Sequence, residues 1–154
     1  MELKVKTFPE LTTAELYEIL KSRAEIFVVE QNCVYQDLDG KDQNSLHIFF
    51  EENGRAAAYL RVFALDEKTV QMGRVLTLQH GMGLGGKLLK EGIRQAFQRY
   101  GAERIYIEAQ CYAAGFYERE GFRICTGEFL EDGIPHVGME LKKSIKVKNA
   151  LSGM

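Results

Sequence analysis

The segment Gln79-His80-Gly81-Met82-Gly83-Leu84-Gly85-Gly86-Lys87 decides the fold, because it joins an expected strand at 68–78 to an expected helix. The apolar face of that helix consists of Leu84, Leu88, Leu89, Ile93, Ala96, Phe97 and Tyr100. A strand that turns into a helix leaves the first helical N–H groups unpaired at the positive end of the helix dipole. Alternating glycines at 81, 83 and 85 let a phosphate approach these groups closely. The segment therefore predicts a phosphate-binding turn rather than one that only packs helix on strand.

Two common phosphate motifs fit this turn only in part. The pattern G-x-G-x-x-G covers 81–86, but dinucleotide binding needs an acid at the end of the next strand, where Gln110 stands. Glu103 precedes that strand and would lie at its opposite end. The pattern G-x-x-x-x-G-K covers 81–87, but Leu88 stands where a Ser or Thr must coordinate Mg²⁺. Both interpretations therefore fail on one required residue.

A third pattern fits the turn better. His80-Gly81-Met82-Gly83-Leu84-Gly85 resembles the Q/R-x-x-G-x-G/A pyrophosphate loop of GNAT-type N-acetyltransferases. Further along, Phe116-Tyr117-Glu118-Arg119-Glu120-Gly121-Phe122 resembles the F-Y-x-x-x-G-F segment of the same superfamily. Two departures from the pattern stand out: His80 replaces the usual Gln or Arg, and the turn after Leu78 is about two residues shorter than usual.

Segments outside that core narrow the resemblance to the ElaA-type acetyltransferase family. They are RAEIFVVEQNC at 23–33, YQDLDG at 35–40, GRV at 73–75 and EDGIPHVGM at 131–139. Together with the turn they span nearly the whole chain. The chain is therefore similar to this family from end to end, although the resemblance supplies no acceptor.

The resemblance implies a mixed α/β fold, the GNAT-like acyl-CoA N-acyltransferase fold. In it a twisted, mixed central sheet is flanked by helices and is splayed where acetyl-CoA enters. It also implies acetyl-CoA as co-substrate, with one strand N–H polarising the thioester carbonyl, and an amine as acceptor. The residues implied in binding acetyl-CoA are Val75, Leu76, Thr77, His80, Gly81, Met82, Gly83, Leu84, Gly85, Gly86, Lys87 and Phe116.

Tyr117 is the candidate general acid, since its position agrees with the tyrosine of the superfamily. A phenol with a pKa near ~10 stays protonated at neutral pH and can donate to a departing thiolate. The structural alternative is a core tyrosine on a short amphipathic helix. Glu30 and His136 are the first candidates for the general base, ahead of Glu108, and each could accept a proton directly or through water.

Four other residues have open or structural interpretations. Arg74 could approach a ligand phosphate or pair with a carboxylate. Asp37 and Asp39 could attract a cationic amine, although turn chemistry at Asp39-Gly40 is the favoured interpretation. Cys111 follows a strand without an identifiable His or Asn partner, so direct attack by the amine is expected rather than an acetyl-cysteine.

The remaining elements follow from capping and alternation. A capping box Thr12-x-x-Glu15 begins a helix that is expected to end near Glu30, and Asn53-Gly54 predicts a hairpin turn. A loop rich in turn formers is expected from Asn32 to Asn44. Strands are expected at 2–8, 46–52, 55–64, 104–110, 122–127 and 134–141, and a short helix at 113–120.

Composition limits the class of protein. The 154 residues carry a formal net charge of −2 and 45% hydrophobic residues, so we expect one globular domain at 1–141 and no nucleic-acid partner. The basic tail at 142–154 is expected to be frayed. Three cysteines without a C-x-x-C pair predict neither a disulfide framework nor a metal site. Without a signal-peptide pattern or an apolar span, a cytoplasmic protein without a membrane partner is expected.

Two other functions stay open at this point. A non-catalytic acyl-CoA-binding or sensing module would keep the glycine turn but need neither Tyr117 nor a base. A nucleotide-binding protein would prefer ATP or NAD to CoA. The oligomeric state is also open, a homodimer included.

Overall fold

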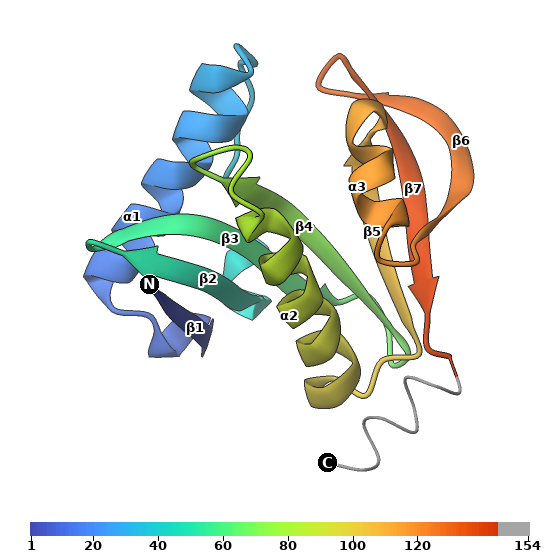
Figure 1. Cartoon of the computed structure of the whole chain (residues 1–154), viewed down its shortest axis with the longest axis horizontal. Helices are drawn as coiled ribbons and strands as arrows, with labels where there is room; N and C mark the ends of the chain where they lie inside the picture. The colour runs from blue at the N-terminus through green and yellow to red at the C-terminus, as the bar shows by residue number, and fades with distance from the viewer. Residues whose placement is uncertain (145–154) are drawn as a thin grey trace. The chain divides into compact units, whose positions relative to one another are not determined.

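The computed structural model describes residues 1–144, which divide into two compact units (Figure 1). The first unit contains residues 1–63 and 73–92, and the second contains 64–72 and the described residues from Ile93 onward. Strand β4 (Thr69–Thr77) and helix α2 (Leu84–Arg99) each belong partly to both units. That these two units form one domain at 1–141 stays a prediction.

The elements confirm the expected mixed α/β class. In chain order they are β1 (Glu2–Thr7), η1 (Phe8–Glu10), α1 (Thr13–Arg23), η2 (Ala24–Glu30), η3 (Asp42–Asn44), β2 (Leu46–Glu52), β3 (Arg55–Ala64), β4, α2, β5 (Arg104–Gln110), η4 (Cys111–Ala113), α3 (Ala114–Glu118), β6 (Arg123–Glu131) and β7 (Ile134–Lys142). The sheet has seven strands in the order β1-β2-β3-β4-β5-β7-β6. Strands β4 and β5 are parallel, whereas the pairs β1–β2, β2–β3, β5–β7 and β6–β7 are antiparallel.

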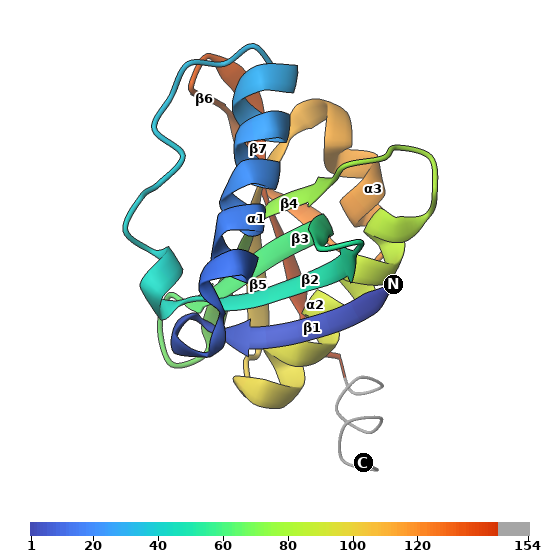
Figure 2. The same cartoon turned by 90° about the vertical axis from the view of Figure 1, so that its left-hand side faces the viewer.

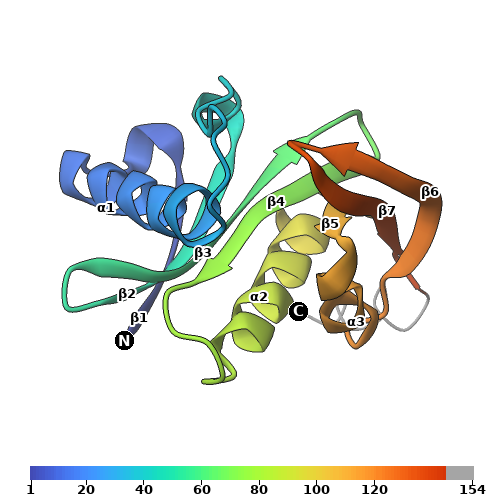
Figure 3. The same ribbon diagram turned by 90° about the horizontal axis from the view of Figure 1, so that it is seen from above.

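In the first unit, α1 lies across strands β1, β2 and β3 (Figures 2 and 3). The predicted hairpin between β2 and β3 is confirmed, with Asn53 and Gly54 both at positive φ, 52° and 76°. Side chains from the helical segments and the strands form a common core of Ile19, Ile26, Phe49, Ala56, Tyr59 and Leu76. The Ser22 hydroxyl is buried beside it and donates to the Ala56 carbonyl oxygen at 2.8 Å.

The predicted capping box begins α1. The Glu15 N–H donates to the Thr12 hydroxyl at 3.0 Å, and the Thr12 N–H donates to the Glu15 carboxylate at 2.8 Å. The helical segment continues to Glu30 as expected, but from Ala24 it widens into the π-helix η2. Such wide turns are rare and occur often at functional sites.

A buried arginine–aspartate network holds the loop that returns from η2 to η3. Arg23 is fully buried, and its Nε and Nη1 donate to Asp37 and Asp42 at 2.9 Å and 2.7 Å. Arg61 donates to Asp42 at 2.9 Å and also pairs with Asp39. Buried charges are stable only when they are paired in this way, so the network fixes the loop although it contains little regular structure.

His47 completes this region as a neutral side chain. Its Nε2–H donates to the Asp42 carbonyl oxygen at 2.9 Å, so its Nδ1 accepts from the Tyr59 hydroxyl at 2.7 Å. Burial lowers the pKa of His47 and keeps the imidazole uncharged between the arginines.

The second unit centres on β5, which pairs in parallel with Thr69–Met72 of β4 and antiparallel with β7. Strand β6 was expected at 122–127, but it continues to Glu131. Asp132 and Gly133, at φ 51° and 77°, form the turn to β7. The expected strand was too short because most of β6 is exposed and has no alternating pattern that marks its end.

The β6–β7 ladder shifts register between Ile124 and Glu128. The Gly138 N–H on β7 donates to the Thr126 hydroxyl at 2.7 Å, and a Cβ at Gly138 would lie 2.6 Å from Thr126 Cγ2. Only glycine therefore allows this close approach of the bulged strand.

Strand β7 ends at Lys142, and the Lys143 N–H donates to the Glu103 carbonyl oxygen at 2.9 Å. These two lysines of the predicted tail are therefore attached to the sheet, while 145–154 lie outside the described residues. Cys33, Cys111 and Cys125 are free thiols. Within residues 1–144, no helix combines the length and apolarity that crossing a membrane requires.

Glu15 offers a test of the N-terminal packing. Burial opposes its ionisation, but the Thr12 N–H and the ammonium groups of Lys4 and Lys6 lower the pKa of Glu15 to about 2. Because this value lies below the usual 4.5, the stabilisation is fully present above pH 4.5 and is lost as pH falls toward about 2. We expect Glu15→Gln to lower the free energy of unfolding by roughly 1–3 kcal/mol at neutral pH.

The measurement is urea unfolding at a series of pH values. The difference in the free energy of unfolding between Glu15→Gln and the wild type should shrink as pH falls toward about 2. Glu10→Gln is the matched control, since Glu10 caps η1 in the same way but is exposed. An unchanged difference across the series would contradict the assignment.

Candidate functional site

The glycine turn leaves N–H groups exposed at the start of α2. Leu78 donates its N–H to the Ala57 carbonyl oxygen at 2.9 Å, which ends the strand region, and the chain then turns through 79–83 (Figure 1). The Lys87 N–H reaches the Gly83 carbonyl oxygen at 3.5 Å and forms the first bond of the helix. By helix geometry, the N–H groups of 84–86 precede that bond and lack an intrahelical acceptor.

The space beside these N–H groups is open. Gly81 and Gly83 have φ of +80° and +70°, which favour glycine, and a Cβ at either position would meet no atom within 4 Å. A Cβ at Gly86, which lies in the first turn of the helix, would likewise meet no atom within 4 Å. Exposed donors, the positive end of a helix dipole and an open approach together make an anion site.

The structure brings His80 and Glu30 together. His80 Nε2 lies 3.1 Å from the Glu30 carboxylate, and both side chains are exposed. Glu30 is the last residue of the π-helix η2, so the end of this wide helical segment lies beside the turn. The Glu30 carboxylate would repel an anion bound at the turn unless a cation pairs with it. A protonated His80 supplies that pairing.

The second half of β4, Gly73–Thr77, continues beyond the ladder to β5, which covers Thr69–Met72. Leu76 is 3% exposed and packs in the core of the first unit, whereas Val75 and Thr77 are half-buried. Any contact of Leu76 with a ligand must therefore come from its backbone.

The open question at Arg74 is answered by its contacts. Its Nε donates to Asp37 at 2.8 Å, and its Nη2 donates to the Asp37 carbonyl oxygen at 3.0 Å. Arg74 thus pairs with a carboxylate, and the acids at 37 and 39 are both bound to arginines instead of facing an amine. Arg74 also has φ +54°, a left-handed conformation that costs a non-glycine residue roughly 1–2 kcal/mol.

Tyr117 is buried in the second unit, on α3. Its ring packs edge-on against Phe116 and Phe122, with centroids 5.0 Å and 5.9 Å away. Burial, together with the nearby Tyr112, raises the pKa of Tyr117 well above its ordinary value. The phenol therefore stays protonated, as a general acid requires, and it also has the packing contacts of the structural alternative.

His136 is also buried in the second unit. Its Nδ1–H donates to the Ile134 carbonyl oxygen at 2.7 Å, and its ring stacks on Phe129 at 6.0 Å. Its Nε2 lies 3.4 Å from the Glu131 carboxylate. The Nδ1 bond orients the ring so that Nε2 faces the Glu131 carboxylate.

Two less favoured candidates also lie in this unit. The third candidate base, Glu108, accepts from Gln71 Nε2 at 3.4 Å. Burial and the charge of Glu128 raise the pKa of the Cys111 thiol, which lowers its reactivity as a nucleophile.

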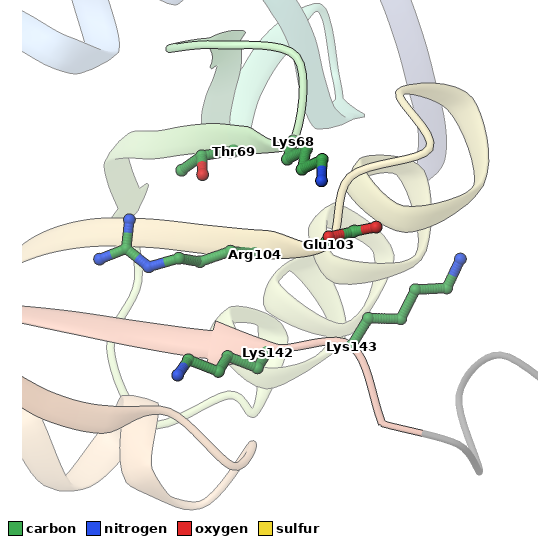
Figure 4. Close-up of a pocket in the computed structure, with 6 residues that line it drawn as sticks. All are labelled: Lys68, Thr69, Glu103, Arg104, Lys142 and Lys143. Atoms are coloured by element: carbon green, nitrogen blue, oxygen red, sulfur yellow. The ribbon is translucent and has the colours of Figure 1, made fainter.

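A hollow of about 380 Å³ lies in the second unit near the start of β5 (Figure 4). It is lined by Lys68, Thr69, Glu103, Arg104, Lys142 and Lys143. The lining includes none of the residues predicted to bind acetyl-CoA or to take part in catalysis. Among residues 1–144, no three His, Cys, Asp or Glu side chains are grouped so that they could hold a metal ion.

Comparison with known proteins identifies the family. The family model described as "Acetyltransferase (GNAT) domain" matches residues 10–143. The chain belongs to the GNAT acetyltransferase family. This confirms the resemblance that the turn and the F-Y-x-x-x-G-F segment indicate.

The relatives of this GNAT chain include ElaA of Escherichia coli. That protein is 36% identical over 136 residues, which cover 84% of this chain and 89% of ElaA. The crystal structure of ElaA aligns with this chain at a TM-score of 0.86 and 33% identity. The alignment covers 92% of this chain and 99% of ElaA. An acyl-CoA N-acyltransferase from Pseudomonas aeruginosa aligns with a TM-score of 0.85 and 36% identity over 91% and 99% of the chains. The ElaA-type and fold predictions are therefore confirmed.

A more distant GNAT neighbour shows the fold alone. It is a GNAT family acetyltransferase from Elizabethkingia anophelis, solved with acetyl-CoA bound. It aligns with a TM-score of 0.62 and 14% identity over 91% of this chain and 97% of its own.

Sequence reasoning missed two buried arginines of the first unit. Arg23 and Arg61 are 0% and 3% exposed, although arginine is expected at the surface. Arg23 lies within the quoted RAEIFVVEQNC segment, but nothing in its spacing identifies Asp37 and Asp42 as partners.

Gly86 offers a test of the anion site. Glycine-to-aspartate substitution at this position places a carboxylate in the first helical turn, where it favours the helix but repels a diphosphate. For Gly86→Asp we expect the Kd for CoA to rise at least about tenfold, while the melting temperature stays at or above the wild-type value. Isothermal titration calorimetry and thermal melting measure the two quantities.

Gly86→Asn is the isosteric neutral control, and its Kd should stay within about threefold of wild type. Equal Kd values for the two variants would show that no anion binds beside this residue.

Proposed function

We propose that this protein transfers an acetyl group from acetyl-CoA to a primary amine, by direct attack of the amine on the thioester. The observation that carries the proposal is the open glycine turn, which presents the N–H groups of 84–86 at a helix N-terminus directly after β4. Family membership supports acyl transfer, and the Elizabethkingia neighbour supports acetyl-CoA as a ligand of this fold. The acceptor class, the donor and a cytoplasmic location stay predictions.

The turn residues His80–Lys87 are proposed to hold the diphosphate through their backbone groups. The strand residues Val75, Leu76 and Thr77 would hydrogen-bond the pantetheine arm, and one strand N–H would polarise the thioester carbonyl. Such a donor typically contributes a few kcal/mol at the transition state. Phe116 is also proposed to contact the co-substrate.

In the proposed reaction, the neutral amine attacks the thioester carbonyl carbon, a C–N bond forms, and the C–S bond breaks. The thiolate of CoA takes a proton from the Tyr117 hydroxyl, and the amine gives up a proton to a base. A buried phenol with a raised pKa stays protonated at neutral pH, so its proton is available to the departing thiolate. The reaction needs no metal and no oxidant.

The direct test of this function is incubation with acetyl-CoA and a panel of amines, with thiol release as the readout. Turnover with at least one amine supports the proposal. Saturable CoA binding without turnover would instead identify the acyl-CoA-binding module, and a preference for ATP or NAD in thermal-shift experiments would identify a nucleotide-binding protein.

Tyr117 carries a specific prediction. In Tyr117→Phe the ring packing is preserved and the proton is lost, so kcat should fall about 10²-fold while the Kd for CoA stays within about twofold. Tyr17→Phe is the control, because Tyr17 on α1 is 69% exposed. If Tyr117→Phe has the wild-type kcat, Tyr117 takes no part in the reaction.

The base is tested by the pH dependence of kcat in Glu30→Gln and His136→Gln. The variant that lacks the base should lose about 10²-fold in kcat together with the acidic limb of the profile. Glu30→Gln should also change the Kd for CoA, because Glu30 contacts His80 at the turn. Unchanged profiles in both variants would contradict both assignments and leave Glu108 as the candidate.

A further inference from the structure

Arg74 is unusual among the residues with left-handed backbones. Among residues 1–144, the other non-glycine residues with positive φ are Asn32, Asn53 and Asp132, whose side chains tolerate this conformation. Arg74 has no such preference, and it lies inside β4 rather than in a turn. Something outside the local sequence must therefore hold its backbone at φ +54°.

The contacts of the Arg74 side chain supply that constraint. Asp37 accepts from Arg74 with both a carboxylate oxygen and its backbone carbonyl, at 2.8 Å and 3.0 Å. Asp39 lies 3.5 Å from Nη2, and the guanidinium carbon lies 6.0 Å from the Tyr35 ring centroid. Two hydrogen bonds to one residue fix the direction of a guanidinium as well as binding it.

Asp37 is itself rigidly held. Its Oδ2 accepts from Arg23 at 2.9 Å, and the Tyr35 hydroxyl donates at 3.0 Å to Oδ1, the oxygen that Arg74 also binds. Arg23 is fully buried and is bound on its far side by Asp42. Asp37, which binds Arg74, is therefore held by the interior of the first unit and does not move with an exposed loop.

The position of Arg74 in β4 indicates what its ion pair with Asp37 does. The residue directly follows Met72 and Gly73, where the ladder to β5 has ended, and directly precedes Val75. The φ and ψ of a residue set the direction of the peptide groups on both sides of it, so a left-handed residue redirects the backbone amides of an otherwise extended strand.

We propose that Arg74 and Asp37 are positioning residues for the donor strand: their ion pair holds Arg74 in the left-handed conformation and thereby directs the amide of Val75 toward the thioester. This inference rests on the proposed acetyl transfer. It assigns Arg74 no contact with acetyl-CoA. The ion pair acts on the reaction only through the backbone of β4.

Comparison of two substitutions at position 74 tests the proposal. Alanine and glycine both remove the ion pair, but glycine adopts positive φ at no steric cost, whereas alanine favours the extended conformation. We expect kcat to fall about tenfold in Arg74→Ala, and Arg74→Gly to recover most of that loss. The KM for acetyl-CoA should change less than about threefold in both, because the diphosphate is assigned to the turn.

Asp37→Asn extends the test through a double variant. If Asp37 acts through Arg74, Asp37→Asn should lower kcat on its own but add little to Arg74→Gly. Arg55→Ala is the control for loss of an exposed arginine ion pair in the same unit, since Arg55 pairs with Glu25 at 3.0 Å, and its kcat should equal the wild-type value.

Equal losses of kcat in Arg74→Ala and Arg74→Gly would overturn the proposal, because they would show that the side chain itself is needed. Crystal structures of the two variants provide a readout that is independent of activity. Residue 74 should be extended in Arg74→Ala and left-handed in Arg74→Gly, and a left-handed residue in both would also overturn it. If the wild type acetylates no amine, the proposed function fails while the structures still decide the conformational claim.

Discussion

A fully buried guanidinium governs the first unit of this protein. Arg23 has no exposed surface, and although burial opposes its charge, Tyr59 and the carboxylates of Asp42 and Asp37 raise its pKa. A buried cation without such partners is unstable, so the chain between η2 and η3 must bring both aspartates to it. Through Asp37 the same constraint reaches Arg74, and through Asp42 it reaches Arg61 and His47. One charged group in the interior thus organises the loop, a strand and the tautomer of a histidine.

The proposed site relies on backbone groups more than on side chains. Diphosphate recognition is assigned to N–H groups at a helix start, where His80, Met82 and Lys87 have exposed side chains. A turn of this kind depends on glycine geometry rather than on one polar side chain, which explains how His80 can stand where the family usually has Gln or Arg. His80 lies 3.1 Å from the Glu30 carboxylate, so the end of η2 contacts the turn at this position.

Local patterns predicted most of the fold. The Asn53-Gly54 hairpin signal predicted the bounds of β2 and β3, and the capping box predicted the start of α1. The end of β6 was missed because an exposed edge strand has no apolar alternation to show where it stops. The turn was found from its glycines, but the partners of Arg23, Asp37 and Arg74 depend on which segments meet in three dimensions. The left-handed backbone of Arg74 was equally hidden, since arginine has no preference for it.

The outermost strands of the sheet differ from the interior ones in a way that affects the behaviour of concentrated protein. Strand β6 is bulged at Thr126 and cannot offer an even row of backbone donors and acceptors to a passing chain. Strand β1, at the opposite end of the order, carries Lys4 and Lys6, which are held in ion pairs with Glu15 of the same chain. Charged side chains on an edge strand disfavour pairing with a further strand. Both margins of the sheet thus carry features that disfavour the addition of further copies.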